Sequence, residues 1–411
     1  MLAAVVVFSL TYVAVAAGRF PFLSLDRPAA ALLGAVLMVA AGVLTPGEAG
    51  GAVNGDTLGL LLGMMILSAY LGEAGFFRWA SHRVIRAVHS PRTLLWALVF
   101  TAGGLSALLV NDTVCLMMTP LVVAIVDETE LPPLPYLLAV AFGANAGSAA
   151  TLTGNPQNMI VGTLSGISYA RFAAALLAPA LVALVLVATI LHLLFRRDLP
   201  RRRLETHLAP PPLDRTLLAK ALAALAVALG GFLLGFPLSW TALFAGALCM
   251  AVAGRAPREA LLRVDWPLLL FFAGLFVVVA GIARAGVAGR MYQAIAPALG
   301  AGVERQLVVF SAFAVAASQL VSNVPFVILA GEWIPRLAEP ELLWLGTALA
   351  ATLAGNLTPV GSVANLIVLE LAGARGRVSF GRFAAIGGLV TGATLVAGLG
   401  VLLAERALGL L

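Results

Sequence analysis

Long apolar runs alternate with short polar segments along the whole chain. About 20 apolar residues are enough for one helix to cross a bilayer. Runs of about that length predict single spans at 2–18, 28–44, 56–74, 171–195, 216–234, 237–253, 265–282 and 381–404. Amphipathic stretches at 78–92 and 285–298 predict helices outside the spans, the first lying at the membrane surface. The pattern predicts an all-α polytopic membrane protein.

Four further apolar elements are too long for one span, and a polar cluster interrupts each of them. They cover 92–126, 136–166, 303–338 and 341–372, with interruptions at 111–113, 151–158, 322–325 and 355–362. Broken helices leave backbone groups unpaired, which a membrane tolerates only beside a cavity or inside protein. We therefore predict two re-entrant hairpins, 92–126 and 303–338, and two broken helices. A simpler alternative at the first interruption is that Asp112 or Thr113 caps a helix starting near Val114, and both can hold.

The chain repeats this order of elements in two halves, 1–195 and 215–411, joined by a hydrophilic linker at 196–214. Each half has three spans, a hairpin, a broken helix and a last span. Residues 151–161 also align with residues 358–368, with Thr, Gly, Asn, Ile and Val at the same offsets. Asn111 and Asn323 occupy matching earlier positions. With about ten spans and two hairpins, each half crosses five times, which predicts an inverted repeat of the kind found in secondary transporters.

Composition supports this organisation and adds a sidedness. The chain is 61% hydrophobic and 11% charged, which excludes a soluble globular protein. In the predicted topology, one side of the membrane carries 19 of the 25 basic residues, in the loops 19–27, 75–92, 196–220, 254–263 and 373–382. By the positive-inside rule that side is cytoplasmic. We expect a protein of the inner (plasma) membrane with both termini outside, and the net charge of +6 does not indicate nucleic-acid binding.

The four interruptions supply the candidate solute-binding groups at mid-membrane. Amide and hydroxyl side chains hydrogen-bond oxygen-bearing solutes, half-helix N-termini favour partial negative charge, and glycines let a solute approach the backbone. The candidates are Asn111, Asp112, Thr113, Thr151, Gly154, Asn155, Asn158, Ser322, Asn323, Thr358, Gly361, Ser362 and Asn365. Asp112 is the only acidic residue in the interruptions, and no Lys or Arg lies in them. An intramembrane carboxylate indicates function, so Asp112 is the candidate proton carrier.

Other chemistries find little support in the sequence. No nucleophile–base pair or metal-ligand cluster stands out, so we expect no enzyme activity, no cofactor and no bound metal. No P-loop motif for ATP is present, although a separate ATPase subunit is not excluded. Cys115 lies three residues after Asp112. It fits a small core residue better than a thiol ligand, because efflux needs weak and reversible binding.

The interrupted stretches resemble the ion transporter superfamily of arsenite permeases, NhaD-type sodium/proton antiporters and divalent-anion/sodium symporters. Residues 111–120, 148–158, 322–325 and 354–368 are most similar to ArsB-type arsenite efflux permeases and plant silicon-efflux transporters. The resemblance implies two re-entrant hairpins, with residues 111–113 at one tip and Ser322 and Asn323 at the other. It also implies a homodimer and proton-driven export. The symporters carry Ser-Asn-Thr at both tips, and the departure from that pattern here weakens the case for two sodium sites.

The sequence thus predicts a secondary transporter that exports arsenite or silicic acid in exchange for protons. Two alternatives stay open: a sodium-coupled symporter of dicarboxylates or other anions, and a sodium/proton antiporter.

Overall fold

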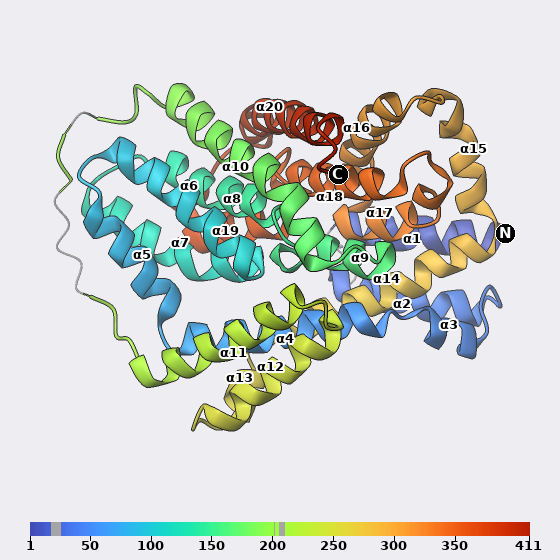
Figure 1. Ribbon diagram of the computed structural model, residues 1–411, viewed down its shortest axis with the longest axis horizontal. Helices are drawn as coiled ribbons and strands as arrows, with labels where there is room; N and C mark the ends of the chain where they lie inside the picture. The colour runs from blue at the N-terminus through green and yellow to red at the C-terminus, as the bar shows by residue number, and fades with distance from the viewer. Residues whose placement is uncertain (18–25, 201, 205–209) are drawn as a thin grey trace.

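The computed structural model describes residues 1–17, 26–200, 202–204 and 210–411, and Figure 1 shows its arrangement. These residues form 20 α-helices and four short 3-10 helices, and no strand occurs among them. The polytopic all-α fold predicted from the apolar runs is therefore what the structure shows. Part of the predicted linker, residues 201 and 205–209, lies outside the described residues.

The first half runs from α1 to α10. Its elements are α1 Leu2–Ala17, α2 Arg27–Ala40, α3 Pro46–Ala52, α4 Gly55–Glu73, α5 Phe76–Ala87, α6 Pro91–Leu108, α7 Asn111–Glu128, α8 Pro133–Ser148, η1 Leu152–Gly154, α9 Pro156–Ser165 and α10 Tyr169–Leu194. The predicted hairpin 92–126 corresponds to α6 and α7. The predicted broken helix 136–166 corresponds to α8, η1 and α9.

The second half repeats the same order from α11 to α20. Its elements are α11 Arg215–Leu233, α12 Leu238–Val252, α13 Pro257–Leu261, α14 Trp266–Arg284, α15 Val287–Leu299, α16 Val303–Val321, α17 Asn323–Ala330, η2 Ile334–Arg336, α18 Pro340–Ala354, η3 Pro359–Gly361, α19 Val363–Ala372, η4 Gly373–Gly376 and α20 Phe380–Ala407. Here α16 and α17 form the hairpin, and α18, η3 and α19 form the broken helix.

Five helices of the described chain are long and apolar enough to cross a membrane alone: α4, α10, α11, α14 and α20. Shorter apolar helices include α2, α12 and α18. Helices α8 and α18 are buried along almost their whole length. The broken helices therefore lie inside the protein, where neighbouring side chains reach the backbone groups freed at the breaks.

The two halves pack on each other through reciprocal contacts. Helix α4 packs on α12, and its counterpart α14 packs on α2, as Figure 1 also shows. A β-carbon at Gly63 of α4 would lie 2.3 Å from the backbone of Ala242, and one at Gly274 of α14 would lie 2.7 Å from the backbone of Ala31. Both the glycines and their partners stand 211 positions apart. Such matched pairs are what a two-fold relation between the halves produces.

Candidate functional site

A small cavity of ≈ 50 Å³ lies where the two hairpins and the two broken helices meet; we call it the central cavity. Helices α7, α9, α17 and α19 border it, together with the start of α2 and the first two turns of α14. Figure 1 shows α9, α14 and α17 grouped together. Its polar lining consists of Arg27, Asn111, Asp112, Gln157, Ser322, Asn323 and Ser362.

The first hairpin turns at Leu109 and Val110, before the polar cluster. Val110 is extended and precedes the first helical residue, so Asn111 and Asp112 lie in the first turn of α7. The alternative in which Asp112 or Thr113 caps a helix beginning near Val114 is therefore wrong. The carboxylate of Asp112 is left available to the cavity.

The second hairpin turns at Ser322, which has φ +70° and ψ 160°. An L-residue rarely adopts this region, and such strain concentrates at functional sites. The strained turn brings Asn323 to the start of α17, as Val110 brings Asn111 to the start of α7. The two asparagines hence face the central cavity from matching positions.

Asn145, in the last turn of α8, links the two halves of the site. Its Oδ1 accepts hydrogen bonds from Asn111 Nδ2 and from Ser362 Oγ, both at 3.0 Å. Its Nδ2 donates to Asn356 Oδ1 at 2.9 Å and to Asn365 Oδ1 at 3.3 Å. Asn145 is 2% exposed. This network fixes the orientation of Asn111.

The two helix breaks are held by the same hydrogen bonds. Asn158 Nδ2 donates to the carbonyls of Ser148 and Thr151, at 3.1 and 3.0 Å. Asn365 Nδ2, 207 positions later, donates to the carbonyls at the matching positions 355 and 358, at 2.7 and 3.0 Å. These bonds satisfy carbonyls that the interrupted helices leave without a helical partner. The internal repeat thus extends from the sequence to individual contacts.

Two amide oxygens at the central cavity have no hydrogen-bond partner among the described residues. They are Oδ1 of Asn111 and Oδ1 of Asn323, whose residues are 4% and 7% exposed. Because Asn111 donates its own amide hydrogens to Asn145, its oxygen is the group left for a solute. Buried acceptors without partners are costly, so this pair indicates a solute or ion that occupies the cavity.

The structure separates the predicted residues into two roles. Asn111, Asp112, Ser322, Asn323, Gly361 and Ser362 line the central cavity. Thr113 faces the neighbouring cavity, beside Asp112. The remaining candidates hold the helix breaks, through the side chains of Thr151, Asn155, Asn158, Thr358 and Asn365 and the close packing of Gly154. Support of this kind positions the residues that line the central cavity.

Sequence reasoning missed two residues of the site. Arg27 lines the central cavity, although the positive-inside interpretation had assigned it to a loop. No sequence signal separates it from other loop arginines. Asn145 was also missed, yet it is a polar residue in the middle of an apolar run, and that signal could have identified it.

Two larger cavities flank the site and correspond to each other in the repeat. The first vestibule, ≈ 360 Å³, includes Met65, Asp112 and Asp265. The second vestibule, ≈ 250 Å³, includes Asn54 and Phe276. Asn54 and Asp265 stand 211 positions apart, as do Met65 and Phe276. Only the first vestibule shares lining with the central cavity, at Asp112 and Leu268.

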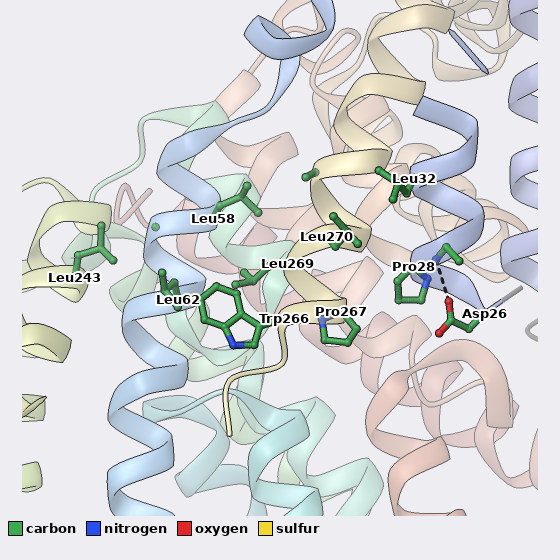
Figure 2. A pocket seen from close by; sticks show the side chains of 13 residues that line it. Asp26, Pro28, Leu32, Leu58, Leu62, Leu243, Trp266, Pro267, Leu269 and Leu270 are labelled. Atoms are coloured by element: carbon green, nitrogen blue, oxygen red, sulfur yellow. Dashed lines mark hydrogen bonds between the residues drawn. The ribbon is translucent and has the colours of Figure 1, made fainter. Parts of the chain in front are cut away.

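A larger cavity, ≈ 800 Å³, is an apolar groove between α2, α4, α12 and α14 (Figure 2). Its lining includes Leu32, Leu62, Trp266 and Leu270. Asp26 is its only acidic residue, and that carboxylate caps α2 by accepting from the Ala29 N–H at 2.9 Å. Without further polar groups the groove does not suit a hydrophilic solute.

Comparison with known proteins gives consistent matches over most of the chain. The CitMHS family model, described as citrate transporter, matches residues 12–341. The silicon efflux transporter LSI3 of Oryza sativa subsp. japonica is 30% identical, over 86% of this chain and 86% of that protein. The putative transporter arsB of Dictyostelium discoideum is 26% identical, over 85% and 82%. These matches confirm the resemblance to ArsB-type permeases of the ion transporter superfamily.

The fold also matches a solved structure, that of the YdaH transporter of Alcanivorax borkumensis. The TM-score is 0.60, with 18% sequence identity, over 99% of this chain and 97% of that chain. At this identity the match concerns the fold alone.

Proposed function

Because the chain belongs to the CitMHS citrate transporter family, we propose that it exports a small uncharged metalloid hydroxide, arsenious acid or silicic acid, in exchange for protons. The family consists of transporters, so the chain is a multi-pass membrane transporter. The relative named as a silicon efflux transporter supports the solute class. We place the protein in the inner (plasma) membrane, with both termini outside.

The unpartnered oxygens of Asn111 and Asn323 are the observation that carries this proposal. Amide oxygens only accept hydrogen bonds, so a solute that hydrogen-bonds to them must supply the hydrogens. A neutral hydroxide has several O–H donors and also lone pairs for the amide and hydroxyl donors of the lining. A fully ionised oxyanion would leave both oxygens unsatisfied.

Asp112 supplies the coupling in this mechanism. It borders both the central cavity and the first vestibule, so it can meet the solute and exchange protons with water. Ionised Asp112 accepts a hydrogen bond from a solute hydroxyl, and charge makes such bonds stronger. A proton arriving on Asp112 removes that charge and favours release of the solute. Proton and solute then compete for one site, as antiport requires.

A sodium-coupled transporter is the second candidate. The two free amide oxygens and the carboxylate of Asp112 are also oxygen ligands of the kind that a hard cation binds. The family description names citrate, an anion. Sodium dependence therefore separates the two candidates.

The test is proton movement in proteoliposomes, followed with a pH-sensitive dye while arsenite, silicic acid, succinate or sodium is added singly. We expect arsenite or silicic acid to trigger proton flux without sodium, and Asp112→Asn to abolish it. Asp127→Asn is the matched control, because it makes the same change at the exposed end of α7. Flux triggered by sodium alone, or succinate uptake that needs sodium, would overturn the proposal in favour of the corresponding alternative.

A further inference from the structure

The central cavity is the middle one of three cavities in a row. It shares Asp112 and Leu268 with the first vestibule. On its other side it shares Arg27 and Ser322 with a further cavity of ≈ 50 Å³, which lies between α1, α2 and α16. One acidic and one basic side chain therefore stand at the two ends of the central cavity.

Within the described part of the chain, Arg27 forms no ion pair and no hydrogen bond with another side chain. The adjacent Asp26 caps α2 and borders the apolar groove instead, as Figure 2 shows. Glu370, which interacts electrostatically with Arg27 without direct contact, is exposed. A partly buried guanidinium thus presents its donors to the cavity without neutralisation by direct contact.

We propose that Arg27 is a solute-binding residue, which donates hydrogen bonds to the oxygens of the solute while Asp112 accepts from its hydroxyls. This inference rests on the proposed function and names the chemistry of its binding site. A guanidinium only donates and an ionised carboxylate only accepts, so a solute that spans both must carry lone pairs and O–H groups. Hydroxides of arsenic and silicon have both.

Because of these two residues, the solute charge that the cavity prefers depends on whether Asp112 is protonated. With Asp112 ionised, its charge and that of Arg27 cancel, which suits a neutral solute. With Asp112 protonated, Arg27 alone remains and the cavity attracts a monoanion. Hydrogen selenite, a monoanion with three oxygens like arsenious acid, should therefore compete better as the pH falls.

The first experiment measures the uptake of arsenite or silicic acid into inside-out proteoliposomes for wild type, Arg27→Gln and Arg27→Lys. Loss of a hydrogen bond to a charged group should raise KM about ten- to hundredfold in Arg27→Gln. Arg27→Lys keeps the charge and should give an intermediate KM. Asp26→Asn is the control, because Asn also caps helices, and should leave KM unchanged. An unchanged KM in Arg27→Gln, or an equal rise in Asp26→Asn, would overturn the proposal.

The second experiment does not depend on transport, so it distinguishes failure of this inference from failure of the proposed function. Asp112→Asn imitates the protonated cavity, and we expect hydrogen selenite to raise its melting temperature. In the double variant Asp112→Asn/Arg27→Lys the same addition should raise the melting temperature by less. In Asp112→Asn/Arg27→Gln it should not raise it at all. Equal shifts in melting temperature with and without Arg27 would contradict a binding role for Arg27.

Discussion

At the scale of single residues, Asn145 should matter as much as the residues that touch the solute. It accepts from Asn111 and Ser362 and donates to Asn356 and Asn365. Asn145→Ala leaves these four groups without that partner, and three of them belong to buried residues, Asn111, Asn356 and Asn365. We expect a loss of about 1–3 kcal/mol in the free energy of unfolding and at least a tenfold lower transport rate, because Asn111 loses its orientation. Thermal unfolding in detergent and proteoliposome flux measure the two effects.

Thr347→Val is the matched control for Asn145→Ala. Thr347 is also a fully buried polar residue, on α18, but its hydroxyl bonds only to the Leu343 carbonyl of the same helix, at 2.7 Å. Thr347→Val should therefore leave the transport rate near that of wild type. Equal losses in both variants would show that burial, and not the link between the halves, explains the effect of Asn145.

Much of the site could be predicted from the sequence at this scale, because polar residues inside an apolar run are conspicuous. Asn111, Asp112 and Asn323 all line the central cavity as expected. Arg27 could not be predicted, since its place in the cavity depends on packing against hairpins more than 80 and 290 positions away. The sequence pattern shows the residue type at each position, whereas tertiary packing determines which residues line the cavity.

At the scale of elements, the glycines of the two helix breaks should differ in their tolerance of substitution. A β-carbon at Gly154 would lie 2.2 Å from the carbonyl oxygen of Ser148, which is fixed backbone. At the matching Gly361 the nearest atoms, Gln319 Oε1 and the carbonyl oxygen of Gly355, both lie 3.1 Å away, which is a much looser contact than 2.2 Å. Gly154→Ala should cost about 1–3 kcal/mol or more through overpacking, and Gly361→Ala clearly less.

Thermal unfolding of the two purified alanine variants tests this difference between related positions. Gly104→Ala is a control within α6, where a β-carbon would meet no atom within 4 Å. It should not lower stability, since alanine favours a helix over glycine. Equal destabilisation at Gly154 and Gly361 would mean that the breaks relax to similar geometry.

The position of the breaks was predictable, whereas their exact shape was not. The short helices η1 Leu152–Gly154 and η3 Pro359–Gly361 fall inside the predicted interruptions 151–158 and 355–362. Pro and Gly end helices for local reasons, so the sequence marks these sites. The first hairpin turns two residues earlier than its polar cluster, at the apolar residues Leu109 and Val110. No local signal marks that turn, because tertiary packing selects it.

At the scale of the whole molecule, the ion pairs of the described chain agree with the predicted grouping of the loops into two sides. Residues on opposite sides of a bilayer cannot form an ion pair. Three pairs join residues predicted on the basic side, among them Arg375 with Asp127 at 2.5 Å. Four pairs join residues predicted on the other side, among them Arg171 with Glu341 at 2.7 Å. No described pair crosses between the two sets.

Reporter fusions test this topology directly. Alkaline phosphatase is active only outside the cytoplasm, and green fluorescent protein exported unfolded stays dark. We expect phosphatase activity and no fluorescence for fusions after Leu411, and the reverse for fusions after Arg203, in the basic linker. The prediction is sharp because an even number of crossings in either half would put Leu411 and Arg203 on one side or invert both results. Fluorescence at both Arg203 and Leu411 would contradict five crossings in the second half, and with them the opposed orientation of the two halves.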